Sequence, residues 1–199
     1  RATKPVSITP LALPALRHVF TRERDPLQST EFAFSRFLVP WLCDYKGWAI
    51  FMDCDMLCRT DIADLWRWKS ATDYAVQVVK HEHAPTEATK FLSQPQTSYV
   101  RKNWSSVMLF NAALCRTLTP DYVSRAPGLA LHQFQWISDN LIGELPRDWN
   151  HLVGYDRPNP SAKLAHFTLG GPYFSEYKDC EFANEWRAMR RLMLSPCDE

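Results

Sequence analysis

The chain has 199 residues, of which 46% are hydrophobic and 23% are charged, a composition typical of a globular domain and not of a disordered chain. The 23 Lys and Arg residues against 22 Asp and Glu residues give a formal net charge of +1, so the chain lacks the cationic surplus of a nucleic-acid-binding protein. No apolar run approaches the roughly 18 to 20 residues that span a bilayer, and no signal-peptide pattern opens the sequence. We therefore expect a cytoplasmic globular protein with no transmembrane segment and no nucleic-acid partner. The 6 cysteines include no Cys-x-x-Cys pair, and we expect them to be reduced thiols.

The first part of the chain predicts a strand, a helix and a second strand. Residues 6–9 are a short apolar strand candidate. A helix is predicted from Glu31 with Thr30 as its cap, and Pro40 is expected to break it because proline cannot donate the helical hydrogen bond. Residues 48–52 are continuously apolar without alternation, which is typical of a strand buried on both faces of a parallel sheet.

The remaining elements continue the alternation of strands and helices. Further strands are predicted at residues 74–79, 107–110 and 163–168, and helices at residues 61–66, 112–118 and 129–137. The polar residues 81–99 predict a long loop or lid. An apolar stripe near the C-terminus predicts a helix that packs on the domain with a solvated basic face, the alternative being a surface for membranes or acidic partners. The pattern predicts an α/β fold with a mostly parallel sheet and helices on both faces.

Two carboxylates, Asp53 and Asp55, follow the apolar strand at residues 48–52. An Asp-x-Asp spacing alone carries little weight, but the carboxyl end of a buried strand is where open α/β sheets bind ligands. Two carboxylates so close repel each other, and a divalent cation makes both ionised forms favourable. The alternative is that one Asp caps the next helix while the other is solvated.

His166 lies in a predicted strand that ends at the turn Gly170-Gly171. A lone histidine is more often a hydrogen-bonded core residue than a ligand, and that alternative stays open here. Two Asp oxygens and one imidazole would suit manganese or magnesium, with open positions for phosphate oxygens.

Six short blocks follow one another in an order known from one enzyme family. They are Phe34-Ser-Arg36-Phe-Leu-Val-Pro40, Gly47-Trp-Ala-Ile-Phe-Met-Asp53-Cys-Asp55-Met-Leu57, Thr60-Asp-Ile-Ala-Asp-Leu-Trp66, Trp104-Ser-Ser-Val-Met-Leu-Phe-Asn111, Leu145-Pro-Arg-Asp-Trp-Asn150 and His166-Phe-Thr-Leu-Gly-Gly-Pro172. Together they resemble the glycogenin-like family 8 glycosyltransferases, the early blocks specifically and the later ones more loosely. The resemblance implies a GT-A fold, a nucleotide-sugar donor and a divalent metal, usually manganese.

The resemblance also implies a metal centre and a donor contact. Asp53, Asp55 and His166 match the family's metal ligands, with Asp53 also binding substrate, and Arg36 matches the arginine that contacts the donor. A metal so held would act as a Lewis acid on the leaving diphosphate, and the planar guanidinium of Arg36 suits a phosphate oxygen or a ribose.

Further residues are assigned to substrate binding and catalysis on the same ground. The block from Ser105 and Ser106 to Asn111 matches the wall near the donor sugar and the acceptor, and Gly171 lies in the turn that follows the histidine. Asp139 is the nearest candidate for the family's Asp-Gln pair at the reaction centre. Three aromatic residues are candidates to stack on a sugar face: Trp104, Trp149 and Tyr173.

Two features depart from the family pattern. Residues 171–174 lack the lysine that grips the diphosphate in family members. Only 52 residues precede Asp53, so the first βα unit of the family is expected to be missing. We therefore expect residues 1–199 to form a single glycosyltransferase-like domain that is a fragment, with a truncated N-terminal edge of its sheet.

The predicted function is a metal-dependent glycosyltransferase that moves a sugar from a nucleotide-sugar donor, a UDP-sugar, to a carbohydrate or other acceptor with Mn²⁺ or Mg²⁺. One alternative is a degenerate module that binds a nucleotide or sugar without turnover. Another is a phosphatase of the haloacid-dehalogenase type, which also places Asp-x-Asp after a buried strand. The chain shows no downstream acidic pair for that enzyme's magnesium and has Leu57 where its signature has Thr or Val.

Overall fold

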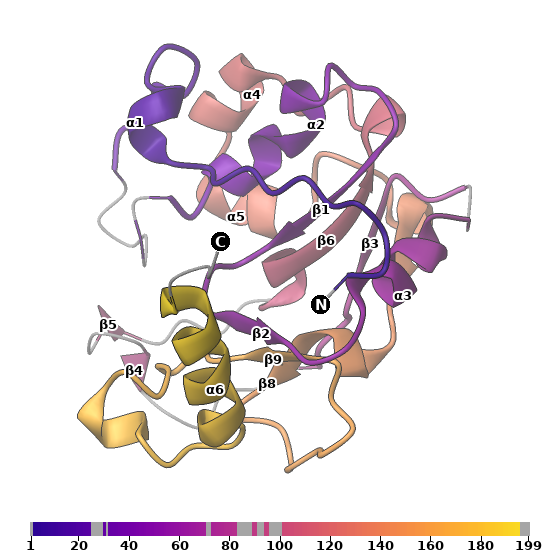
Figure 1. Ribbon diagram of the computed structural model, residues 1–199. Helices are drawn as coiled ribbons and strands as arrows, with labels where there is room; N and C mark the ends of the chain where they lie inside the picture. Colours follow the sequence, from indigo (N-terminus) through magenta and orange to yellow (C-terminus); the bar gives the residue numbers. More distant parts are fainter. Residues whose placement is uncertain are drawn as a thin grey trace.

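A computed structural model describes residues 2–24, 30, 32–70, 73–82, 89–90, 94–95 and 101–195 of the protein. Two sheets form the centre of the molecule, with most of the helices gathered over one sheet and the C-terminal helix beside the other (Figure 1). Among the described residues, no helix has the length and apolar character needed to cross a membrane.

The larger sheet has four strands in the order β1-β6-β3-β7. Their bounds are β1 Trp48–Met52, β3 Val76–Val78, β6 Val107–Asn111 and β7 Ile142–Glu144. Strand β6 runs antiparallel to both β1 and β3, whereas β7 runs parallel to β3. In the part of the chain that the structure describes, β1 is an edge strand, and its five residues are half-buried.

The smaller sheet has three strands in the order β2-β9-β8. Their bounds are β2 Met56–Cys58, β8 His151–Leu152 and β9 Leu164–His166. Strand β9 pairs antiparallel with β2 and parallel with β8. A separate antiparallel pair joins β4 Thr89–Lys90 to β5 Gln94–Pro95.

The expectation of a mostly parallel sheet is wrong, because both sheets are mixed. The apolar runs at residues 48–52 and 107–110 are strands as predicted, but such a run records burial and not direction. The chain returns between β3 and β6 so that β6 inserts antiparallel between β1 and β3. The α/β class is confirmed.

The helices are short except for the last one, and only part of their predicted extent is confirmed. The α-helices are α1 Leu13–Leu16, α2 Val39–Leu42, α3 Ile62–Trp66, α4 Pro120–Arg125, α5 Gly128–His132 and α6 Ala183–Leu194. Single turns of 3-10 helix lie at Ser35–Leu38, Arg67–Ser70, Trp104–Ser106, Ala112–Leu114, Asp139–Leu141, Arg147–Asn150 and Ser175–Tyr177. The helix predicted at residues 112–118 is only the single turn Ala112–Leu114, and the helix predicted at residues 129–137 ends at His132. No helix is predicted where α4 lies.

Several predictions near the N-terminus can be compared with the structure. Residues 6–9 are extended and exposed but pair with no strand in the described chain, so the predicted strand is wrong. The helix expected from Glu31 begins at a residue outside the described set, and the structure shows 3-10 helix over Ser35–Leu38 followed by α2 with Pro40 in its first turn. The predicted loop at residues 81–99 lies largely outside the described residues.

Alternation along β1 divides its side chains between two apolar clusters. Ala49 and Phe51 face the cluster that α1, α2, α4 and α5 cover, whereas Trp48 and Ile50 face the cluster that contains Leu65 of α3. Helices therefore lie on both faces of the larger sheet. The second cluster also holds Leu164 of β9, so it joins the two sheets.

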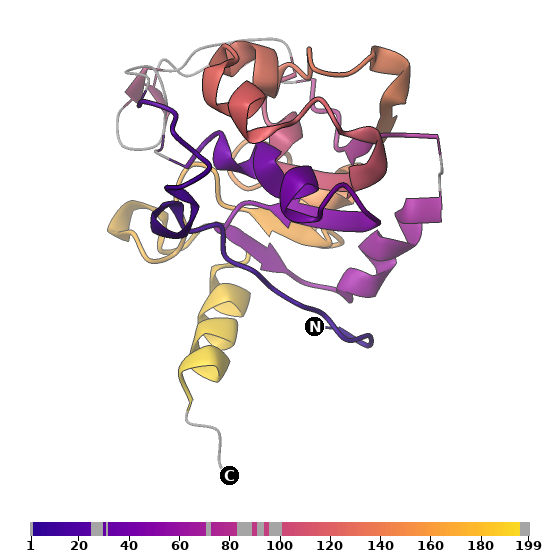
Figure 2. The ribbon, with the colours of Figure 1, turned by 90° about the horizontal axis from the view of Figure 1, so that it is seen from above.

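Helix α6 packs only along its first half. Phe182, Trp186 and Met189 contact a third cluster on the smaller sheet, whereas Met193 is 82% exposed. Seen from above, the helix extends away from the body of the molecule (Figure 2).

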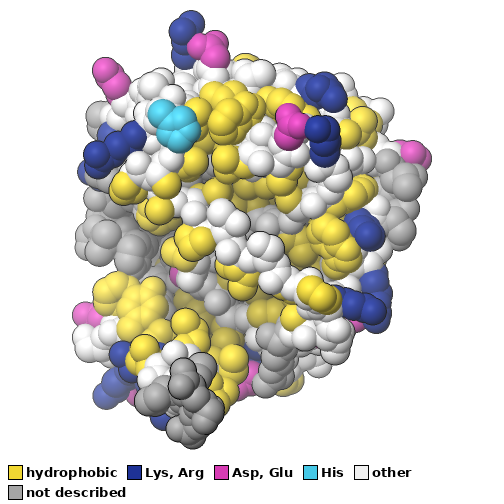
Figure 3. Space-filling view, turned by 45° about the horizontal axis from the view of Figure 1, so that its top comes forward, with side chains coloured by type: hydrophobic (Ala, Val, Ile, Leu, Met, Phe, Trp, Pro, Cys, Tyr) yellow, Lys and Arg dark blue, Asp and Glu magenta, His cyan; other side chains and the backbone are white. Residues whose placement is uncertain are grey.

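The charged side chains on the face in Figure 3 are scattered, with no large area of one sign.

Candidate metal centre

The strand register brings Asp53, Asp55 and His166 together. Asp53 follows β1, Asp55 precedes β2, and the antiparallel pairing of β2 with β9 sets His166 opposite Met56. The Phe167 amide donates to the Asp55 carbonyl at 2.9 Å and extends this pairing past the strand ends. One ligand atom from each of the three side chains lies within 4.8 Å of the other two.

Asp53 is held by the buried guanidinium of Arg36. Nη2 lies 2.8 Å from Oδ1 and Nη1 lies 3.1 Å from Oδ2, a two-pronged ion pair. Arg36 also donates through Nε to the Ala33 carbonyl at 2.8 Å and through Nη1 to the Ser105 carbonyl at 2.9 Å. Because each carboxylate oxygen has two lone pairs, Asp53 keeps acceptor positions beyond those that Arg36 uses.

The orientation of His166 follows from Asn150. The Asn150 amide donates to the Asn103 carbonyl at 3.2 Å, which leaves its Oδ1 as the acceptor for Nδ1 of His166 at 2.9 Å. Nδ1 therefore carries the proton, and Nε2 turns its lone pair toward Asp55, whose Oδ1 is 3.4 Å away. A histidine so oriented by a second residue is the usual arrangement of a metal ligand.

The surroundings of Asp55 favour a cation. Its Oδ1 is buried and makes no hydrogen bond among the described residues, because the contact with Nε2 lacks hydrogen-bond geometry. Burial raises the pKa of Asp55, but His166 in its doubly protonated form outweighs burial, with smaller contributions from the Asp55 backbone amide and from Arg36, so the net direction is down. An ionised, buried and unsatisfied oxygen is costly without a positive partner, and a divalent cation would satisfy it. Two carboxylates and one neutral imidazole fit Mn²⁺ or Mg²⁺.

Of the predicted wall, the structure brings Ser105 and Ser106 to this centre. The Ser106 carbonyl accepts from the Asp53 amide at 3.0 Å, and the Ser105 carbonyl accepts from Arg36. The Ser105 hydroxyl lies 2.8 Å from Nδ1 of His132. Sequence reasoning assigned His132 no role, because nothing in its local sequence marks it.

Two further predicted residues are not among the three that the structure groups as candidate metal ligands. Asn111 is opposite Trp48 in the register of β6 with β1, at the strand end away from Asp53. Asp139 forms an exposed ion pair with Arg101 at 2.6 Å, and the guanidinium lowers the pKa of the carboxyl. Substrate and catalytic roles for these two residues remain predictions.

Gly171 lies in the turn after β9, five residues after His166. The Gly170 amide donates to the Phe167 carbonyl at 2.9 Å, and the Phe174 amide donates to the Gly171 carbonyl at 3.0 Å. Gly170 has φ +141°, a conformation that side chains rarely adopt, so the first glycine of the pair serves the backbone of the turn.

A second polar network lies beside Asn150, on β8. His151 is buried and its Nε2 lies 2.7 Å from Glu181, which links β8 to the segment before α6. Asp156 accepts from the Leu152 amide at 2.9 Å and from Arg147 at 2.6 Å. Burial raises the pKa of Asp156, but these two donors lower it further, so its net direction is down.

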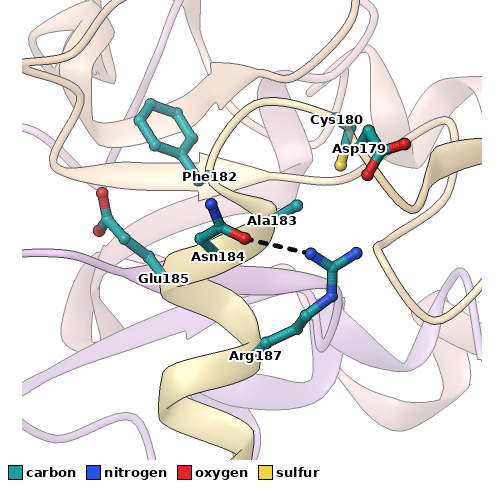
Figure 4. A pocket seen from close by; sticks show the side chains of 7 residues that line it. All are labelled: Asp179, Cys180, Phe182, Ala183, Asn184, Glu185 and Arg187. Carbon is teal, nitrogen blue, oxygen red and sulfur yellow. Dashed lines mark hydrogen bonds between the residues drawn. The ribbon is translucent and has the colours of Figure 1, made fainter.

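A hollow of about 300 Å³ lies at the start of α6 and not at the candidate metal centre. Figure 4 shows Arg187 turned back toward Asn184, to which its Nη1 donates at 3.2 Å. None of the residues that line this hollow belongs to the centre built by Asp53, Asp55 and His166. The lining residues are Asp179, Cys180, Phe182, Ala183, Asn184, Glu185 and Arg187.

The fold resembles that of GT-A glycosyltransferases. The structure of the bifunctional glycosyltransferase WbbM in its apo form matches with a TM-score of 0.59 and 15% identity over 89% of this chain, which spans 37% of that chain. Mouse xyloside xylosyltransferase 1 in its apo form gives a TM-score of 0.46 and 13% identity over 77% of this chain and 70% of that one. At such low identity the likeness concerns the fold alone.

The family is shown by a sequence relative. The chain is 46% identical over 200 residues to Protein CDI of Arabidopsis thaliana, and the alignment covers 94% of this chain and 75% of that protein. The chain therefore belongs to the same family as Protein CDI. No family model matches it.

Proposed function

We propose that this protein is a glycosyltransferase that uses a divalent cation, Mn²⁺ or Mg²⁺, and a nucleotide-sugar donor, a UDP-sugar, to glycosylate a carbohydrate or other acceptor. The observation that carries the proposal is the convergence of Asp53, Asp55 and His166 within 4.8 Å on a fold that resembles GT-A glycosyltransferases. The cytoplasmic location and the single-domain organisation expected from the sequence remain predictions.

The chain's own residues account for binding of an anionic donor. Asp53, Asp55 and His166 would hold the cation, which when bound supplies Lewis-acid stabilisation of the charge on a leaving diphosphate. Arg36 is 7% exposed and is fixed by Asp53 and two carbonyl groups, so its cationic charge stands beside the centre without a cost of ordering. His166 needs no reorientation to present Nε2, because Asn150 already sets its tautomer.

The second candidate function, binding without turnover, is favoured by one observation. Asp139, the candidate catalytic carboxylate, is 76% exposed in its side chain and is paired with Arg101. Catalysis by Asp139 would require this ion pair to open. The phosphatase alternative is disfavoured because Leu57 stands where the signature of that enzyme has Thr or Val.

A screen of nucleotide sugars tests the proposal. Wild-type protein and Asp55→Asn would be incubated with UDP-sugars and with sugars on other nucleotides, with Mn²⁺ or after chelation, and release of the nucleoside diphosphate would be measured. The proposal expects metal-dependent release for at least one donor, lost in Asp55→Asn. Metal-dependent binding of UDP with no release from any donor would favour the binding module. Release of phosphate from simple phosphate esters without nucleotide dependence would favour the phosphatase.

A further inference from the structure

One of the three aromatic candidates for ligand contact presents its ring to solvent. Trp149 is 0% exposed, and Trp104 packs against the main core while its indole nitrogen donates to the His81 carbonyl at 3.0 Å. Tyr173, in contrast, is 54% exposed. Packing in the hydrophobic core accounts for the two tryptophans but not for the exposed ring of Tyr173.

The Tyr173 ring is fixed although it is exposed. Its centroid lies 4.6 Å from the Phe174 ring and 5.6 Å from the Trp186 ring of α6. The ring also lies against Gly171, where an added Cβ would overlap its edge. A side chain held on three sides at the surface has lost most of its rotational freedom before any ligand arrives, which lowers the entropy cost of a contact.

The turn that carries Tyr173 leaves β9 beside the candidate metal centre, because the Phe167 amide donates to the Asp55 carbonyl at 2.9 Å and the Gly170 amide donates to the Phe167 carbonyl at 2.9 Å. Burial raises the pKa of Tyr173, and the negative charge of Asp55 raises it further, against a smaller lowering by the Gly171 amide. A phenol with a pKa above its ordinary value of about 10 is fully protonated at neutral pH. Tyr173 is thus a neutral hydrogen-bond donor that adds no positive charge.

Resting on the function proposed above, we propose that Tyr173 is a substrate-binding residue whose hydroxyl donates a hydrogen bond to a diphosphate oxygen of the donor held at the centre of Asp53, Asp55 and His166. The ligand class follows from the surroundings. A group held by the cation lies next to Asp55, and its anionic oxygens are the strong acceptors there. Gly171 and Trp186 are positioning residues for this contact, because they hold the ring in place.

Substitution of the hydroxyl alone tests the contact. Tyr173→Phe keeps the ring and its packing against Phe174 and Trp186 while it removes the donor. Binding of UDP and of inorganic pyrophosphate would be measured by calorimetry with saturating Mn²⁺, and binding of Mn²⁺ alone by electron paramagnetic resonance. Loss of a hydrogen bond to a charged group is expected to weaken both diphosphates about tenfold while Mn²⁺ affinity is unchanged. The control Tyr177→Phe removes the hydroxyl of another tyrosine in the same loop, the ring of which lies against Gly170. This control is expected to change neither diphosphate affinity nor Mn²⁺ affinity.

The outcomes separate this inference from the proposed function. Wild-type binding of UDP with Mn²⁺ together with an unchanged Tyr173→Phe would overturn the inference alone. An unchanged Tyr173→Phe with a weakened Tyr173→Ala would assign a stacking role to the ring and would also overturn the hydroxyl contact. Wild-type protein that binds Mn²⁺ but neither diphosphate would overturn both. Thermal unfolding of each variant would be measured first, so that only folded protein is compared.

Discussion

Replacement of Arg36 by methionine perturbs the most extensive polar contact in the site. Met has a similar reach but no donors, so Arg36→Met removes two bonds to Asp53 and one each to the carbonyls of Ala33 and Ser105. The side chains of Arg36 and Asp53 are only 8% and 15% exposed, so water replaces these bonds poorly. The variant therefore leaves Asp53 as a largely buried charge without a partner.

The expected cost can be worked from these contacts. Removal of one partner from a buried ion pair costs about 3 to 5 kcal/mol. This is a large part of the roughly 5 to 15 kcal/mol that stabilises an ordinary domain, so Arg36→Met is expected to unfold in much less urea than wild type. Arg36→Lys keeps the charge but loses the planar fork, and we expect a loss of about 1.5 to 3 kcal/mol.

Urea unfolding followed by circular dichroism would measure both variants. Arg67→Met is the matched control, because Arg67 pairs with Asp64 at 2.6 Å while its side chain is 78% exposed. Such an exposed pair contributes about 0 to 1 kcal/mol. In the double variant Arg36→Met with Asp53→Asn, the loss is expected to be smaller than the sum of the single losses by about 1 to 3 kcal/mol. A cost for Arg36→Met no larger than that of Arg67→Met would refute this reasoning.

Three further predictions follow from the site and its surroundings. Asn150→Leu, which cannot accept from His166, is expected to weaken Mn²⁺ binding about 10- to 100-fold, with Asn150→Asp restoring much of it, as measured by electron paramagnetic resonance. Asp156 has a lowered folded-state pKa because its two donors outweigh burial, so its stabilisation is complete above the ordinary carboxyl pKa of about 4 and is lost as pH falls through the folded value. Asp156→Ala should accordingly reduce the fall in unfolding free energy below about pH 4, and an unchanged slope would contradict this. An alkylating reagent should modify exposed Cys54 in the native protein and buried Cys115, whose pKa burial raises to about 12, only after unfolding, as mapped by mass spectrometry.

Part of the candidate site was predictable because its residues stand at strand ends. Asp53 follows a continuously apolar run, and that run is β1. His166 ends a second apolar segment, which is β9. The approach of these two segments was not predictable from periodicity, because it depends on the register of β2 with β9, in which Met56 pairs with His166. The family resemblance supplied that approach.

Strand direction explains why only the first residues of the block from Ser105 to Asn111, the predicted wall of the substrate site, lie near the candidate metal centre. A buried apolar strand looks the same in sequence whether it runs parallel or antiparallel. Because β6 runs antiparallel to β1, its first residues lie beside Asp53 and its last residue, Asn111, lies opposite Trp48. Ser105 and Ser106 are therefore near the centre, whereas Asn111 is not.

Sequence reasoning missed the residues that orient the ligands. Asn150 was noted only as the last residue of a matched block, yet its amide sets the tautomer of His166 and is itself oriented by the Asn103 carbonyl. Such roles depend on hydrogen-bond geometry between distant segments, and no local pattern carries them. Asn103 has a left-handed backbone with φ 65°, a conformation in which Asn is enriched. The sequence alone does not reveal that angle.

A Mn²⁺ titration followed by electron paramagnetic resonance tests the candidate metal centre most directly. Wild-type protein, Asp55→Asn and the control Asp64→Asn would be titrated, since Asp64 is a carboxylate of α3 that pairs with Arg67 outside the centre. The account predicts a single saturable Mn²⁺ site in wild type and in Asp64→Asn, weakened at least about tenfold in Asp55→Asn because one charged ligand is lost. The absence of a saturable site in folded wild-type protein, or an equal affinity in Asp55→Asn, would contradict it.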